Sequence, residues 1–521
     1  MRDEGLSRDS GSVDEDDVST LSGRYATAET PLLGLESPKE PQSLYKQNVI
    51  ILIFAFIFVA ELGGGLWIAP SSAIMENIIC RSHYPDVSSN IMAGDPRCKE
   101  SEIQGTLATI RGWAYTFDCV PGILGAIPYG ILSDKWGRKP VFVLSVLGLV
   151  LSEVWVGMVL YFPNIFPLWT VWFGSAWQLI GGSSSVMSAM LYTMGADVTP
   201  VNERAVVFMQ VNAWFLAAEM ICGPLASILM HRSPWLALVV SISLLAFSNL
   251  IALVFPETLD IQRLKDRQEA AAHGATSTPN DATSDLETSK RTQLQQIWAI
   301  CKKDLHEVYD FILKNQRTTF LLLSLVFVVL GKFVLELILQ YATGRYGWTW
   351  DKAAILVTIR SASTLLLLAV LLPGISWLCV NTLNMTSMAK DLWLARISGI
   401  VQTLGALLVA LSVNGSMLMA SLVVFAGGGG LAPLVRSLAN ALVEEHHVGI
   451  LNSLVGFLDM IGIMVAGPIL AAAMKLGFEW GGAWIGLPFM VSAFLFGIST
   501  FIVWTFRIPR RRLSGDSVEY A

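Results

Sequence analysis

Charged residues are scarce in this chain. Asp, Glu, Lys and Arg make up 15% of its 521 residues, whereas hydrophobic residues make up 53% and the mean hydropathy is +0.56. A soluble protein carries roughly 25% charged residues, so this composition excludes an ordinary water-soluble domain. Apolar runs of about 20 residues, the length that crosses a hydrocarbon core of about 30 Å, recur from end to end. The chain is therefore predicted to be an all-α integral membrane protein.

The sequence also lacks the signatures of nucleotide, metal and nucleic-acid chemistry. A run of four glycines at residues 427–430 is not followed by the Lys-Ser/Thr pair of a phosphate-binding loop. The six cysteines have no metal-ligand spacing, and no basic patch typical of nucleic-acid binding stands out. We expect no cofactor, metal, nucleotide or nucleic-acid partner, and no enzymatic activity.

Apolar runs are missing from the first 44 residues as well. This segment is polar and acid-rich, with four consecutive acidic residues at positions 14–17. Such a composition cannot bury a hydrophobic core. We therefore expect a disordered acidic tail over residues 1–44.

Twelve apolar segments follow this tail. A hydrophilic stretch between the sixth and the seventh divides them into two sets of six, an organisation common in secondary transporters. We expect a six-helix bundle over 45–256, a linker over 257–316, a second six-helix bundle over 317–506 and a tail over 507–521. The segments lie at approximately 46–69, 105–132, 141–162, 166–193, 205–230, 235–255, 317–341, 353–378, 392–412, 416–440, 449–474 and 482–506.

Lys and Arg near the segment ends indicate the orientation. The loop with Lys135, Arg138 and Lys139, the linker and the C-terminal tail carry these cations, whereas the short loops near Pro163 and Asn414 carry none. An even number of spans places both termini on one side of the membrane. Both termini, the linker and the basic loop are therefore predicted to be cytoplasmic.

The first outer loop, at residues 71–104, is the longest on its side and contains Cys80 and Cys98. Two cysteines in an oxidising compartment favour a disulfide that closes the loop, and two free thiols are the alternative. Asn414 begins an Asn-Gly-Ser glycosylation sequon on the same side. Its position close to the membrane leaves little room for a bulky glycan.

A short polar loop between the second and third segments reads GILSDKWGRKP. Its spacing resembles the loop signature of the major facilitator superfamily, a family of secondary transporters. The resemblance implies alternating access, with Asp134 and the cations latching the two bundles near the start of the eleventh segment, and a purely topological role for the cations is the alternative. We expect Gly130 to let helices approach closely and Gly137 to let the chain reverse. The signature residues are Gly130, Asp134, Lys135, Gly137, Arg138 and Lys139.

A second resemblance lies in residues 196–200 and the span that follows, with Arg204, Gly223 and Pro224. It is similar to the region between the fourth and fifth spans of tetracycline-type drug:proton antiporters and their fungal relatives. Pro224 is expected to kink this span, because proline removes a backbone hydrogen bond. Glu219 stands where the antiporter motif has another glycine, a departure that places a carboxylate in mid-membrane and counts against antiport.

We single out ten ionisable side chains inside the apolar segments, where a lipid-facing charge costs about 2.5–3.5 kcal/mol. Most of them must therefore face a cavity or pair with one another. The candidates for proton coupling or substrate binding are Glu61, Asp118, Glu219, Glu336 and Asp459; the candidate cavity or interdomain cations are Arg111, Lys332, Arg360 and Arg436; and the tenth residue is Glu153.

Some pairings among these residues are implied by the resemblance. In the superfamily the second span meets the eleventh, and the fifth meets the eighth, across the interface between the bundles. This arrangement implies that Asp118 lies near Asp459 and that Glu219 forms an interdomain salt bridge with Arg360.

Glu61 precedes three glycines at residues 63–65. We expect these glycines to weaken the first helix and to give the carboxylate room to move and hydrate. Glu61 is the first candidate for proton coupling or for binding a cationic substrate group, and Asp118 is the second.

Other charged residues have two interpretations each. Lys332 and Glu336 are four residues apart on one helix face, so they either neutralise each other or serve the cavity. Glu153, on a span normally at the periphery, is expected to be structural or paired with a neighbour. Arg436 either attracts an anionic substrate or extends its charge to the inner membrane face.

From the sequence we conclude that the chain is a secondary transporter that exports a small organic molecule, such as a drug or a secondary metabolite, against a flow of protons. Proton-coupled import of an organic nutrient is the alternative, and a transporter-like receptor without transport is a third candidate. We expect a monomer in the lipid bilayer of the plasma membrane, with the vacuolar membrane as the alternative location.

Overall fold

The computed structural model describes residues 39–85, 95–260, 263, 316–443 and 448–507. The chain divides into two compact units, Met1–Asn48 and Val49–Ala521, and the architecture below is that of the second unit. Most of the expected acidic tail, most of the linker and residues 508–521 lie outside the described residues.

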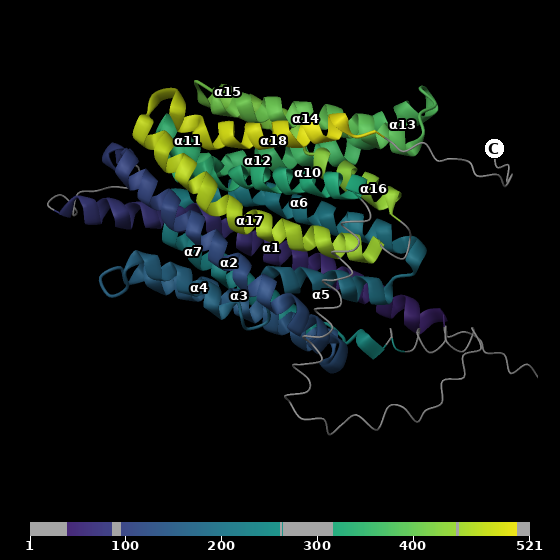
Figure 1. Ribbon diagram of the computed structural model, residues 1–521. Coiled ribbons are helices and arrows are strands. Elements are labelled where there is room, and N and C mark those ends of the chain that lie inside the picture. Colours follow the sequence, from purple (N-terminus) through teal and green to yellow (C-terminus); the bar gives the residue numbers. More distant parts are fainter. Residues whose placement is uncertain (1–38, 86–94, 261–262, 264–315, 444–447, 508–521) are drawn as a thin grey trace, which may run out of the picture. The chain divides into compact units, whose positions relative to one another are not determined.

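Every regular element in the described ranges is a helix, as the sequence predicts (Figure 1). The N-terminal bundle consists of α1 (Lys39–His83), η2 (Pro96–Lys99), α2 (Ser101–Trp136), α3 (Arg138–Tyr161), η3 (Leu168–Phe173), α4 (Gly174–Trp177), α5 (Ser183–Val198), α6 (Val201–Arg232) and α7 (Pro234–Val254). The C-terminal bundle consists of α10 (Gln316–Lys332), η5 (Phe333–Leu337), α11 (Ile338–Tyr346), α12 (Trp350–Leu366), the π-helical turn η6 (Leu367–Leu371), α13 (Leu372–Asn381), α14 (Ser387–Ala410), α15 (Gly415–Gly427), α16 (Leu431–Leu442), α17 (Val448–Trp480), η8 (Gly482–Gly486) and α18 (Leu487–Thr505).

Among the described residues, 11 helices are long and apolar enough to cross a membrane. The expected fourth span does not qualify, because it is interrupted between α4 and α5. Gly181 and Gly182 adopt φ angles of 98° and 84° there, a left-handed conformation that glycine tolerates and other residues rarely adopt. The interruption breaks one long helix into three short pieces.

The first helix is longer than the sequence predicts. It begins at Lys39, inside the expected tail, and continues through Pro70 to His83, so that much of the expected outer loop at 71–104 is helical. Proline is tolerated within a membrane helix where neighbouring groups satisfy the freed backbone. The helix also runs unbroken through the three glycines at residues 63–65. Any weakening that these glycines cause does not interrupt the helix.

Two ends of the bundles serve as landmarks. We call the end that carries Cys80 and Cys98 the disulfide end (left in Figure 1), and the end that carries residues 130–140 the loop end. α2 packs along α17, and α6 packs along α12. The larger apolar core contains residues of both bundles at the disulfide end, whereas the second core belongs to the C-terminal bundle alone.

The bundles approach most closely toward the disulfide end. A Cβ on Gly112 of α2 would lie 2.4 Å from the Cβ of Ala471, and one on Gly223 of α6 would lie 2.3 Å from Oγ1 of Thr358. Gly130, near the loop end of α2, faces open space instead, with no atom within 4 Å of a built Cβ. Among the described residues, the close helix approach expected at Gly130 is therefore absent, and the second core lies within the C-terminal bundle alone.

Candidate functional site

Charged side chains from both bundles meet at the interface between them. Glu219 of α6 forms an ion pair with Arg360 of α12. Beside this pair, Nη2 of Arg111 donates a hydrogen bond of 3.0 Å to the backbone carbonyl of Glu336, and the Tyr115 hydroxyl donates one of 3.1 Å to the Glu336 carboxylate. We call these five residues the central cluster. It joins the bundles through charges that are shielded from water on most sides.

These bonds belong to a set that lies toward the disulfide end. The hydrogen bonds and ion pairs between the bundles involve α2 from Gln104 to Thr116, α6 from Glu219 to His231 and α12 from Trp350 to Arg360. Nearer the loop end, Leu124 of α2 is 61% exposed and Phe457 of α17 is 51% exposed. The central cluster therefore lies at the limit of the contact between the bundles.

Glu61 of α1 lies beside the central cluster. Its carboxyl group interacts electrostatically with Arg360 and Glu336. The same side chain lines a cavity of about 280 Å³ inside the N-terminal bundle, between α1, α3, α5, α6 and α7. Gly64 also lines this cavity and leaves open space there. The expected room for the Glu61 carboxylate is present, although it comes from an open helix face rather than from a weakened helix.

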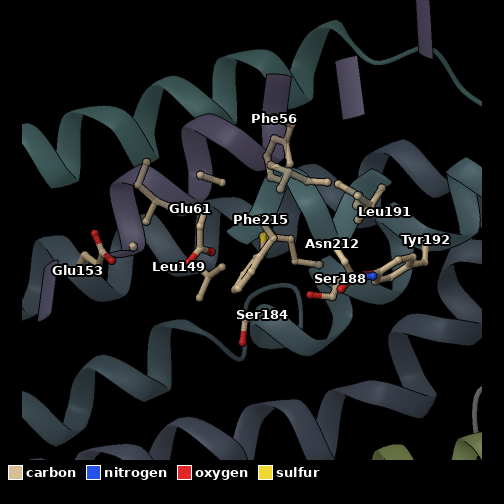
Figure 2. Close-up of a pocket in the computed structure, with 16 residues that line it drawn as sticks. Phe56, Glu61, Leu149, Glu153, Ser184, Ser188, Leu191, Tyr192, Asn212 and Phe215 are labelled. Atoms are coloured by element: carbon tan, nitrogen blue, oxygen red, sulfur yellow. The ribbon is translucent and has the colours of Figure 1, made fainter. Parts of the chain in front are cut away.

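The cavity contains a second carboxyl group, that of Glu153 on α3 (Figure 2). Oε2 of Glu153 is buried and has no hydrogen-bond partner among the described residues. The pairing that the sequence suggests for Glu153 is therefore absent in the structure. The cavity is lined by Phe56, Ile57, Ala60, Glu61, Gly64, Leu149, Glu153, Ser184, Met187, Ser188, Leu191, Tyr192, Val211, Asn212, Phe215 and Leu245.

Asp118 does not face Asp459, contrary to the expectation. Its carboxylate accepts hydrogen bonds from Ser175 Oγ at 2.6 Å and from Gln178 Nε2 at 2.9 Å, both in the interrupted fourth segment. Asp459 instead pairs with Arg436, with 3.0 Å between Nη2 and Oδ2. The break between α4 and α5 explains the difference, because it brings polar groups of the fourth segment to α2.

Lys332 and Glu336 do not pair with each other either. α10 ends at Lys332 and the tighter 3-10 turn η5 follows, which removes the regular helical spacing. Lys332 interacts electrostatically with Asp459 and Arg436, whereas Glu336 belongs to the central cluster. Lys332 and Glu336 therefore do not neutralise each other, which leaves a cavity role as the remaining hypothesis for both, and Arg436 is paired with Asp459.

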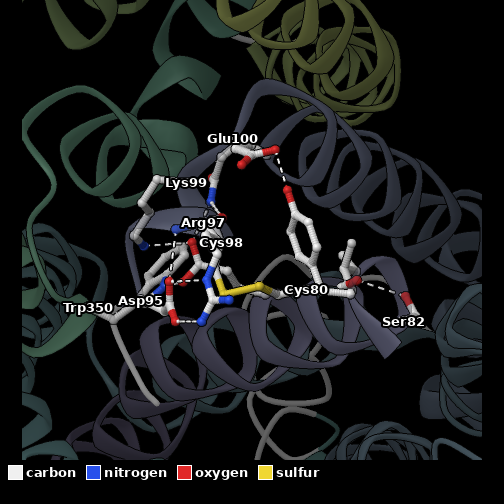
Figure 3. Close-up of a disulfide and its surroundings, with 12 residues drawn as sticks. Cys80, Ser82, Asp95, Arg97, Cys98, Lys99, Glu100 and Trp350 are labelled. Atoms are coloured by element: carbon white, nitrogen blue, oxygen red, sulfur yellow. Dashed lines mark hydrogen bonds and ion pairs between the residues drawn. A yellow bond between two sulfur atoms is a disulfide. The ribbon is translucent and has the colours of Figure 1, made fainter. Parts of the chain in front are cut away.

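A second polar cluster, which the sequence did not indicate, lies at the disulfide end, and two of its members, Lys99 and Trp350, are labelled beside the disulfide in Figure 3. Glu76 of α1 is 4% exposed. One of its oxygens accepts hydrogen bonds from Lys99 Nζ, at 2.6 Å, and from Gln104. The other accepts a bond of 2.7 Å from the indole nitrogen of Trp350, on α12. Gln340 of α11 adds a bond of 2.8 Å to the Gln104 carbonyl. We call these five residues the Glu76 cluster.

Cys80 and Cys98 form a disulfide, which confirms the sequence prediction. The bond ties η2, and with it Lys99, to α1. Arg97 in the same turn donates two side-chain hydrogen bonds and one backbone hydrogen bond to Asp95. These bonds lower the pKa of Asp95 to about 2. The turn that supplies Lys99 is thus held by a covalent bond and by an ion pair.

The comparison with known families identifies the chain. Residues 100–426 match the family model described as Major Facilitator Superfamily. The chain belongs to the major facilitator superfamily. It is thus a multi-pass membrane transporter and not an enzyme, as the sequence predicts.

Relatives and a solved structure agree with this assignment. An efflux pump of Aspergillus flavus, ustT, is 30% identical over 470 residues, which cover 88% of this chain and 90% of the relative. The class H tetracycline resistance protein of Pasteurella multocida is 24% identical over 411 residues, or 76% of this chain and 86% of that protein. The nucleoside transporter NupG shares the fold with a TM-score of 0.56 at 12% identity, covering 88% of this chain and 98% of that one. The predicted likeness to the fungal and tetracycline-resistance branch of the superfamily is confirmed.

The superfamily loop signature forms a network inside the N-terminal bundle. The buried guanidinium of Arg138 lies 2.5 Å from Asp134 and 3.7 Å from Asp197, which belongs to the second sequence motif. The carboxylate of Glu257 accepts hydrogen bonds from the backbone nitrogens of Arg138 and Lys139, at 2.8 and 3.2 Å. The sequence did not indicate Glu257, because it lies in the polar stretch where the linker begins.

Gly137 makes the chain reversal between α2 and α3 possible. Its φ angle is 115°, and a Cβ there would lie 2.3 Å from Oε2 of Glu257. The predicted role of this glycine is confirmed. Asp134 keeps a largely exposed side chain, at 66%, and pairs with Arg138.

Proposed function

We propose that this superfamily member exports a small organic molecule, a drug or a secondary metabolite, in exchange for protons. The central cluster carries the proposal: its ion pair lies across the interface that two bundles must open and close in alternating access. Carboxylates at such a position can couple proton binding to that motion. The names of the two relatives, an efflux pump and a tetracycline resistance protein, support export.

The proposed topology has twelve spans, with the interrupted segment of η3, α4 and α5 as the fourth. It retains the bundles at 45–256 and 317–506, the linker, and both tails on the cytoplasmic side. The disulfide supports this orientation, because disulfides persist in oxidising compartments. We place a monomer in the plasma membrane, with the vacuolar membrane as the alternative; microscopy of a fluorescent fusion distinguishes the two.

With this orientation, the structure represents an inward-open state. The shared core and the Glu76 cluster close the outer side, and exposed apolar side chains on α2 and α17 mark the open inner side. In the opposite state the loop signature latches the inner side, with Asp134 leaving Arg138 to engage the start of α17.

The proposed roles of the charged residues follow from their positions. Glu61 is the first proton-coupling candidate, because it lines a cavity and lies beside Arg360. Glu219 and Arg360 form a pair that must separate when the outer side opens. Asp118 is the second candidate, linked to the interrupted fourth segment. Lys332, Arg436 and Asp459 form a group of charges on the C-terminal bundle, where they contribute to the substrate pathway.

Proton-coupled import is the second candidate function, and Glu219 favours it. This carboxylate occupies the position at which the antiporter motif has a glycine, and it holds Arg360 across the interface. Such a departure from the antiporter motif leaves the direction of coupling open to experiment.

Transport by reconstituted vesicles tests the direction, with tetracycline as the probe. Export by proton exchange predicts that tetracycline accumulates in vesicles whose lumen is more acidic than the medium, because protons leave as the drug enters. Import by symport predicts accumulation only when the medium is the more acidic side. A Glu61→Gln variant that retains full proton-driven accumulation would remove Glu61 from the coupling mechanism.

A further inference from the structure

We propose that the cavity inside the N-terminal bundle is a binding site for organic cations, and that Glu153 on α3 is the carboxylate that receives the positive charge. This inference rests on the proposed function, since it assigns a substrate class to a transporter. From the sequence, Glu153 is expected to be structural or paired with a neighbour. The structure places its carboxyl group in the same cavity as that of Glu61.

The charges around the cavity are unbalanced. Its lining contains two carboxyl groups, those of Glu61 and Glu153, and no Lys, Arg or His. Arg360, the cation near Glu61, is held in an ion pair by Glu219. In the described part of the chain, neither Glu61 nor Glu153 forms an ion pair or a side-chain hydrogen bond, and Oε2 of Glu153 is fully buried.

An unpaired carboxylate in apolar surroundings is strongly disfavoured. The Glu153 carboxyl group therefore requires either a bound proton or a cationic ligand, and each can replace the other. Of the helices packed against α3, α7 and α4 contain no ionisable residue, and α5 supplies only Tyr192 toward the cavity. Arg111 of α2 does not line the cavity and donates its hydrogen bond to Glu336 in the other bundle. Through Ser152 and Gln178, α3 also connects to Asp118, another acid.

The other residues that line the cavity indicate what kind of ligand fits beside the carboxyl groups. Phe56, Phe215 and Tyr192 present aromatic rings to the cavity, and aromatic faces attract cations. Asn212 and Ser188 add amide and hydroxyl groups that can orient a ligand (Figure 2). A volume of about 280 Å³ is at the small end of ligand pockets. An amine or quaternary ammonium attached to a small apolar or aromatic group matches this lining, whereas an anion does not.

Binding of 1-methyl-4-phenylpyridinium to the purified full-length protein tests the inference. This ion carries a permanent charge on a compact aromatic body, and 4-phenylpyridine is its neutral counterpart above about pH 7. We expect the radiolabelled cation to bind wild type at least tenfold more tightly than 4-phenylpyridine does. Glu153→Gln should weaken the binding of the cation by about tenfold, equivalent to ~1.4 kcal/mol, and should leave the binding of 4-phenylpyridine unchanged. Glu102→Gln, at an exposed site on α2, is the matched control and should bind like wild type.

Carbodiimide labelling of wild type provides a second measurement that does not depend on the folding of a variant. Dicyclohexylcarbodiimide modifies protonated carboxyl groups in apolar surroundings. We expect it to label Glu153, and the phenylpyridinium ion, but not 4-phenylpyridine, to protect that residue. Absence of protection overturns the inference.

The outcomes separate this inference from the proposed function. If proton-driven tetracycline exchange persists but the cation binds no better than its neutral counterpart, or if Glu153→Gln binds it unchanged, the cation site is wrong and the exporter stands. If the cation binds through Glu153 while no substrate moves with protons, the site stands and the proposed function is wrong.

Discussion

The indole nitrogen of Trp350, on α12, donates a hydrogen bond of 2.7 Å to Glu76, on α1, and this bond joins the two bundles at the disulfide end. Glu76 also holds Lys99 of its own bundle at 2.6 Å. One buried carboxylate therefore serves the packing within one bundle and the contact between both.

Replacing Glu76 with Gln should destabilise the protein by about 3–5 kcal/mol, because it leaves the buried Lys99 without its anion. The measurement is thermal unfolding in detergent. Glu100→Gln is the matched control: this exposed residue accepts a hydrogen bond from Tyr84 at the same end, and its loss should change the stability by less than about 0.5 kcal/mol. Equal effects of the two substitutions would contradict the role of Glu76 as the centre of the cluster.

Neutralising Glu219 should abolish proton-driven transport and lower stability, because Arg360 then remains charged and unpaired at the interface. The expected cost of Glu219→Gln is about 3–5 kcal/mol. The exchange Glu219→Arg with Arg360→Glu should recover stability relative to either single change. A double-mutant cycle measures this coupling, and additive effects would show that the two residues act independently.

Substituting Gly137 with Ala should destabilise the loop signature by about 1–3 kcal/mol, because its φ is 115° and Glu257 occupies the space of a Cβ. Gly130→Ala, seven residues earlier in α2, has open space around it and should be neutral or stabilising by up to about 1 kcal/mol. Thermal unfolding of the two variants in one detergent compares them directly. A similar loss of stability in both variants would show that neither the backbone strain nor the contact with Glu257 explains the need for glycine at position 137.

Reducing the Cys80–Cys98 disulfide should lower the stability by about 3 kcal/mol, the chain-entropy value for a loop of roughly this length; the two cysteines are 18 residues apart. The Cys80→Ser/Cys98→Ser double variant should unfold at the same temperature with and without reductant, whereas wild type should shift downward with reductant. An unfolding temperature of the wild type that does not change with reductant would show that the disulfide adds nothing to stability.

The ion pair between Asp95 and Arg97 makes the stability of the protein depend on pH, and the sign of this dependence follows from the pKa of Asp95. Its pKa in the folded protein, about 2, is below the ordinary value of 3.8, so its ion pair with Arg97 contributes stability above about pH 4 and loses that contribution as the pH falls through 2. The difference in melting temperature between wild type and Asp95→Asn should be constant from pH 7 to pH 4 and shrink below that. A difference that grows on acidification would contradict the assignment.

Much of the architecture could be predicted from the sequence, since apolar length and the loop signature indicate the helices and the family. The Glu219–Arg360 contact followed from the superfamily arrangement, and the disulfide from two cysteines in one outer loop. The partner of Asp118 was predicted wrongly. The helix break at Gly181 and Gly182 depends on backbone angles, and a hydropathy pattern does not reveal these angles. Glu76 was missed because it lies beyond residue 69, where the first apolar segment was expected to end, in a helix that in fact continues to His83.

In the proposed opening of the outer side, the arrangement of the Glu76 cluster limits the number of bonds that this end of the bundles loses. The disulfide and Lys99 belong to the same bundle as Glu76, so they travel with it when α12 moves away. Only the donors from Trp350 and Gln340 are withdrawn, at roughly 0.5–3 kcal/mol for each bond. The carboxylate enters the opposite state still neutralised by its lysine. Glu76 is thus not left without a counter-ion when this end of the bundles opens and closes.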